Sequence, residues 1–187
     1  MSVKILNLLP VTGDVFTPEM FKYMRKYLEP DTEVQTYQIT SGPPSIECEY
    51  DEALAAPDVL RLAKQGEEDG FQAIFINCFG DPAVKAAREY VDIPVFGGFE
   101  PATHIALGLA DSISIVTVLP NVVPNVEGNV SKARLNGRIV SIRNVNIPVE
   151  ELQDHEKLCK ALAEQSLLAI REDGAQAIVM GCTRSEE

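Results

Sequence analysis

The most constraining feature of this chain is a short segment that occurs twice, 104 residues apart. Residues 68–78 read EDGFQAIFINC and residues 172–182 read EDGAQAIVMGC, with seven identical positions in register. In each copy a glycine follows a helix-like stretch, an apolar strand-like run comes next, and a cysteine closes the segment. The repeat therefore predicts a duplicated helix–strand unit.

The segments around the two copies follow the same order. Strands are expected at 3–9, 33–39, 71–79 and 93–98, and again at 112–120, 137–147 and 175–182. Helices are expected at 56–70, opened by Pro57 or Asp58, and at 81–91, 100–110 and 149–174. Continuously apolar strands are typical of parallel sheets that are buried on both faces.

These patterns predict a duplicated α/β unit with parallel sheets. The expected halves are residues 1–98, which contain Cys78, and residues 99–187, which contain Cys182. The second half is expected to be incomplete. Only five residues follow Cys182, whereas a helix and a strand are expected after Cys78.

Composition limits the partners. Hydrophobic residues make up 45% of the 187 residues, charged residues 24%, and the formal net charge is −12. An acidic surface argues against nucleic acid and anionic membranes as partners. No apolar run approaches the roughly 20 residues that span a bilayer, and no signal peptide is recognisable. We expect a cytoplasmic protein with a small-molecule partner, and homo-oligomer formation is left open.

The four cysteines, Cys48, Cys78, Cys159 and Cys182, show no CxxC spacing, and the chain has only two histidines. We therefore expect reduced thiols and no metal site. Cys159 falls in an amphipathic helical stretch and is expected in the core. Cys48 and Cys159 have no counterpart in the repeat.

Cys78 and Cys182 fall where ligands bind in parallel α/β sheets, beyond the carboxyl ends of the strands. The loop FGDP after Cys78 offers backbone N–H groups, which bind anions and favour a thiolate. Two thiols that face one cleft can remove a proton from one side of a carbon and return it from the other. The competing interpretation is that both are buried core cysteines. Their matched positions favour catalysis.

The segments INCFGDPAVKAARE (76–89), IPVFGGFEPATHIA (93–106) and GCT (181–183) resemble the aspartate/glutamate/hydantoin racemase superfamily, in particular its hydantoin and allantoin racemase branch. Residues 42–60 resemble that branch's segment between the second strand and the helix. The branch usually has Asn-Pro-Asn-Thr after the first strand, where this chain reads Leu9, Pro10, Val11 and Thr12.

The resemblance implies an α/β fold of two pseudosymmetric parallel-sheet (Rossmann-like) halves with a cleft between them. It implies racemisation without a cofactor, with Cys78 and Cys182 as the acid/base pair. It also implies that Phe79, Gly80, Asp81 and Thr183 hold the oxygens of the substrate, and that Thr12 and Thr117 line the cleft. The expected substrate is a hydantoin or another amino-acid derivative.

Three other interpretations are kept. A maleate-isomerase-like enzyme would use a cysteine as nucleophile, and an arylmalonate-decarboxylase-like enzyme would need only the second cysteine. A non-catalytic small-molecule binding protein is the third. The presence of both thiols favours the racemase.

Overall fold

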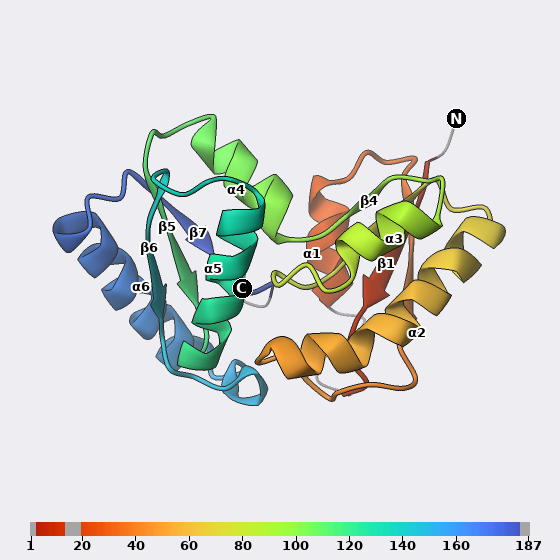
Figure 1. Ribbon diagram of the computed structural model, residues 1–187, viewed down its shortest axis with the longest axis horizontal. Coiled ribbons are helices and arrows are strands. Elements are labelled where there is room, and N and C mark those ends of the chain that lie inside the picture. The colour runs from red at the N-terminus through yellow and green to blue at the C-terminus, as the bar shows by residue number, and fades with distance from the viewer. Residues whose placement is uncertain (1–2, 14–19, 184–187) are drawn as a thin grey trace. The chain divides into compact units, whose positions relative to one another are not determined.

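A computed structural model describes residues 3–13 and 20–183 (Figure 1). The chain forms two compact units. The first comprises residues up to Ile46, Tyr50–Asn77 and Pro82–Phe96, and the second comprises Glu47–Glu49, Cys78–Asp81 and the chain from Gly97 onward. In the part of the chain described here, no helix is long and apolar enough to cross a membrane.

The first unit is built on a parallel sheet of order β2-β1-β3-β4. Its strands are β1 (Lys4–Leu9), β2 (Glu33–Gln38), β3 (Ala73–Ile76) and β4 (Val95–Phe96). Its helices are α1 (Met20–Tyr27), α2 (Glu49–Glu68) and α3 (Val84–Tyr90). The central strands β1 and β3 supply fully buried side chains, including Leu6, Leu8, Ile74 and Ile76, as expected for strands covered on both faces.

The second unit is built on a parallel sheet of order β6-β5-β7. Its strands are β5 (Ile113–Thr117), β6 (Ile139–Asn144) and β7 (Ala177–Met180). Its helices are α4 (Phe99–Leu107), α5 (Val123–Lys132) and α6 (His155–Glu172), with short 3₁₀ turns at Pro120–Val122 and Val149–Glu151. Every residue of β5 is buried, as expected for the central strand.

The two sheets repeat one topology, which confirms the predicted pair of parallel-sheet halves. β1 lies between β2 and β3, and β5 lies between β6 and β7. The residue before each repeat cysteine makes the same bond to the central strand: Asn77 N donates to Leu8 O (2.8 Å), and Gly181 N donates to Val116 O (2.7 Å).

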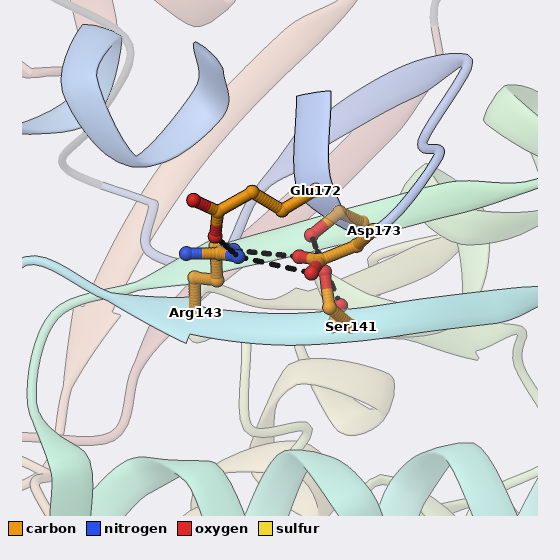
Figure 2. Close-up of polar contacts among 5 residues, drawn as sticks. Ser141, Arg143, Glu172 and Asp173 are labelled. Carbon is orange, nitrogen blue, oxygen red and sulfur yellow. Dashed lines mark hydrogen bonds and ion pairs between the residues drawn. The ribbon is translucent and has the colours of Figure 1, made fainter. Parts of the chain in front are cut away.

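The recurring EDG triplet has a structural reason. Gly70 and Gly174 adopt left-handed φ values of 82° and 73°, which glycine accommodates without strain. The aspartate before each glycine binds a side chain on an edge strand of its sheet. Tyr37 on β2 donates to Asp69, and Arg143 on β6 donates to Asp173 (Figure 2). Each triplet thus ends a helix and ties that end to the sheet.

Two predicted helix boundaries are wrong. α2 begins at Glu49, and Pro57 lies inside it, so most of the expected connecting segment 42–60 is helical. Asp58 lies inside the helix and does not open it. Its carboxylate accepts hydrogen bonds from Thr40 N and Ser41 N in the loop after β2. The stretch 149–174 is a 3₁₀ turn followed by α6, which starts where Asp154 accepts a bond from Lys157 N.

The expectation that Cys159 lies in the core is also wrong, because Cys159 is exposed. The buried face of α6 is formed by Leu158, Leu162 and Ala169. Successive helical residues are about 100° apart around the axis, so Cys159 points away from that face.

Candidate functional site

Cys78 and Cys182 occupy equivalent places. Each lies two residues beyond its strand, since β3 ends at Ile76 and β7 ends at Met180. Both are partly buried, and none of the four cysteines is in a disulfide. Cys78 follows a strand of the first unit but is packed with the second unit, to which Cys182 also belongs.

The loop that carries Cys78 lies against the start of α4. The carbonyl oxygen of Cys78 accepts hydrogen bonds from Asp81 N and Gly98 N, both at 3.3 Å. A Cβ atom on Gly98 would lie 3.0 Å from Phe79 Cα and 3.2 Å from Cys78 O. Because these are backbone atoms that cannot rotate away, a side chain at position 98 would force the neighbouring backbone to shift, and glycine is favoured there.

Asp81 binds the first turn of α4. Its Oδ1 accepts from Phe99 N at 2.9 Å, and its Oδ2 accepts from Glu100 N at 3.3 Å. This satisfies two amide groups that a helix start leaves without partners. Burial raises the pKa of the Asp81 carboxyl to about 6, although the two N–H donors act in the opposite direction.

The two residues between Cys78 and Asp81 are held as well. Phe79 is buried, and its ring meets that of Phe99 edge to face with the centroids 5.7 Å apart. The carbonyl oxygen of Gly80 accepts a hydrogen bond of 2.7 Å from Asn129 Nδ2 on α5. Phe79, Gly80 and Asp81 therefore all contact the second unit, and their contact with a substrate stays a prediction.

The Cys182 side has its own close packing. Thr117 is fully buried at the end of β5, and its hydroxyl donates to Gly181 O at 3.2 Å. A Cβ on Gly181 would lie 2.9 Å from Thr117 Cβ and 3.0 Å from Ile115 Cγ2. Thr183, directly after Cys182, is partly exposed. The structure therefore brings Thr117 and Thr183 to the segment that carries Cys182.

Thr12 lies in the first unit, after β1. Its backbone N–H and its hydroxyl both donate to Pro43 O, at 2.9 and 3.1 Å. Leu9 and Val11 are buried. Thr12 is thus the only polar residue of residues 9–12, and its side chain is bound to the loop after β2.

The loop after β2 is held in turn by Asp58. Its carboxylate accepts from Arg61 Nε as well as from the two loop amides of Thr40 and Ser41. The hydrogen bond from Arg61, supported by the amides, lowers the pKa of Asp58 to about 2. Asp58 therefore stays charged and keeps this loop in place at any physiological pH.

A chain of polar side chains, two of them buried asparagines, was missed from the sequence. Asn77 Nδ2 donates to Asn7 Oδ1 at 3.1 Å, and Asn7 Nδ2 donates to Thr36 Oγ1 at 3.2 Å. Asn7 is completely buried. The chain runs from β2 to β1 and ends just beyond β3, at the residue before Cys78. Its signal was an asparagine within each of two otherwise apolar runs, since buried polar groups need partners.

Among residues 3–13 and 20–183, no group of three or more His, Cys, Asp or Glu side chains is placed so that it could hold a metal ion.

Comparison with known proteins gives the family. The profile of the Asp/Glu/hydantoin racemase family matches residues 5–185. A hydantoin racemase from Pseudomonas sp. (strain NS671) is 35% identical over 188 residues, which cover 100% of this chain and 75% of that protein. The structure of allantoin racemase from Klebsiella pneumoniae matches with a TM-score of 0.92 at 35% identity, over 98% of this chain and 75% of that one. Allantoin racemase from Pseudomonas fluorescens matches with a TM-score of 0.90 at 28% identity, over 97% and 77%. The chain belongs to the Asp/Glu/hydantoin racemase family.

Proposed function

We propose that this protein racemises a hydantoin-like compound at a stereocentre next to a carbonyl group, and that Cys78 and Cys182 are its acid/base pair. Relatives named hydantoin racemase and allantoin racemase make the chain an isomerase and suggest the substrate class. The observation that carries the two-thiol assignment is the matched position of the cysteines, each two residues beyond equivalent strands.

The enzyme holds the same number of protons before and after the proposed reaction. A thiolate on one face of the carbon takes the proton, and the C–H electron pair moves into the adjacent carbonyl to form an enolate. The thiol on the opposite face then gives its proton to the carbon, and the carbonyl re-forms. The two sulfurs end with their roles exchanged, so either enantiomer is a substrate.

The enolate oxygen needs hydrogen-bond donors while it carries charge. Thr183 is our candidate for a side-chain donor, because it is adjacent to Cys182 and partly exposed. Asp81 is less suited to this role, because its carboxylate oxygens already accept bonds from α4 and a carboxylate cannot donate.

The test uses pure enantiomers of allantoin and of a 5-substituted hydantoin in D₂O. We expect loss of optical activity together with deuterium incorporation at the stereocentre. Because such protons also exchange slowly without enzyme, the control is the Cys78→Ser/Cys182→Ser double variant at equal concentration. A wild type no faster than this control on every compound would contradict the proposal.

Two further arms separate the alternatives. Maleate is added to the panel, and conversion to fumarate without racemisation of the rings would identify a maleate-isomerase-like enzyme. An arylmalonate is added as well, and release of CO₂ would identify a decarboxylase. Ligand binding by calorimetry with no turnover in any arm would identify a binding protein.

A further inference from the structure

The segment Cys78–Asp81 is held by the second unit at every one of its four residues. Cys78 O accepts from Gly98 N, and Phe79 packs on Phe99. Gly80 O accepts from Asn129, and Asp81 binds two amides of α4. Asp81 is the anchor to α4, and Asn129 is the anchor to α5.

The backbone of the segment is irregular. Asp81 N donates to Cys78 O over a long 3.3 Å. Asp81 and Ala83 have left-handed φ values of 56° and 57°, which are unfavourable for residues with a side chain. α3 begins only at Val84, so no regular structure covers the interval. Backbone in such conformations persists only when its surroundings hold it there.

The position of the thiol therefore depends on these anchors. A catalytic group works only within hydrogen-bond reach of the atom it attacks, and a displacement of about 1 Å can cost about 100-fold in rate. Cys182 is part of the same unit. Anchoring the Cys78 segment to α4 and α5 makes both thiols features of one compact unit.

We propose that Asp81 and Asn129 are positioning residues, which hold the Cys78 segment on the second unit and so set the place of its thiol relative to Cys182. For catalysis this rests on the proposed function. The anchoring itself is independent of any activity and can be measured without a substrate.

Two variants test it. Asn129→Ala removes the donor to Gly80 O, and because alanine has the higher helix propensity, α5 itself is not weakened. Asp81→Gly removes both acceptors while glycine accommodates the left-handed φ, and Asp81→Asn keeps one acceptor. Matched controls are Gly128→Ala, the neighbour of Asn129, whose added Cβ would meet nothing within 4 Å, and Asp154→Ala, which removes a similar bond from the start of α6.

The first readout is hydrogen–deuterium exchange of peptides covering 78–82 and 97–101. We expect both peptides to exchange at least about tenfold faster in Asn129→Ala and Asp81→Gly, with an intermediate rate in Asp81→Asn. The controls should leave them unchanged. The second readout is the alkylation rate of Cys78 relative to Cys159, an exposed thiol on α6 that serves as internal standard. This ratio should change in the anchor variants and stay constant in the controls.

The third readout is racemisation, where kcat should fall about 10- to 100-fold with a smaller change in KM, since a misplaced thiol slows the chemical step. Folded anchor variants with wild-type exchange in 78–82 and a wild-type alkylation ratio would overturn the proposal. Wild-type kcat in both anchor variants would overturn it too. If the wild type itself racemises no compound, the proposed function fails. Hydrogen–deuterium exchange and alkylation still test whether Asp81 and Asn129 anchor the segment.

Discussion

Arg143 and Asp173 form a two-pronged ion pair: Nε lies 2.6 Å from Oδ2 and Nη2 lies 2.9 Å from Oδ1. The pair joins β6 to the end of α6 (Figure 2), and Tyr37 and Asp69 form its counterpart in the first unit at 2.7 Å. The duplicated fold has kept the carboxylate and changed the donor. Asp173 is thus a structural residue, although it lies in the segment that ends on Cys182.

Replacing Arg143 tests this role. Arg143→Met should lower the melting temperature by several degrees, because it leaves Asp173 and Glu172 without their common partner. The control is Lys157→Met, which breaks a pair with Glu151 whose side chains are both more than half exposed and should change stability little. Equal melting temperatures for the two variants would contradict the role given to Arg143.

Asp173 should also contribute to acid unfolding. The hydrogen bonds from Arg143 and Ser141 lower the pKa of Asp173 to about 2, against an ordinary value of 3.8. A lowered pKa stabilises the folded state above 3.8, and that contribution is lost as the pH falls from 3.8 towards 2. In urea titrations, the stability difference between wild type and Asp173→Asn should therefore shrink over this interval. A difference that stays constant from pH 5 to pH 2 would argue against it.

Asp81 should have the opposite effect on the pH dependence of stability. Its pKa of about 6 lies above the ordinary 3.8, so its contribution to stability is fully present below 3.8 and is lost as the pH rises through 6. Stability relative to Asp81→Asn should thus increase as the pH falls from 7 to 4. Glu100 is the charged side chain that adds to the shift, and Glu100→Gln should reduce the pH dependence without abolishing it. A wild-type advantage that grows towards neutral pH would refute this assignment.

Gly98→Ala should disturb the Cys78 segment directly. The new Cβ would lie within 3.3 Å of three backbone atoms of Cys78 and Phe79, so the segment must shift by several tenths of an ångström. We expect a loss of racemisation of about tenfold or more and a stability loss of about 1–3 kcal/mol. Gly128→Ala, in the open, should instead gain up to about 1 kcal/mol and keep full activity. Denaturant titration and the racemisation assay check both.

The single variants of the two cysteines should differ in the enantiomer whose proton they exchange with solvent. Cys78→Ser and Cys182→Ser should each lose racemisation by several orders of magnitude, because serine is a far weaker base than a thiolate. Each variant should still exchange the proton of one enantiomer with D₂O, since the remaining thiol removes and returns it on its own face, and the two variants should prefer opposite enantiomers. Exchange of the same enantiomer by both would exclude opposed thiols.

The sequence by itself determined the duplicated α/β architecture, the parallel sheets and the equivalence of Cys78 and Cys182. These follow from local patterns: apolar runs of strand length, a glycine at each helix end, and identical residues in register. It also predicted correctly that helices end at Gly70 and Gly174, because a left-handed residue after a helix is a local requirement.

Only the tertiary structure decided which partners the polar side chains take. Neighbouring aspartate and proline residues are typical of a helix start, yet Asp81 binds the start of α4, 18 residues later, and Asp58 binds a loop 17 and 18 residues before it. The exposure of Cys159 and the assignment of the Cys78 segment to the second unit were decided in the same way. Local propensity sets how the backbone runs, but a buried carboxylate takes the donors that packing brings to it, and these come from segments remote in the chain.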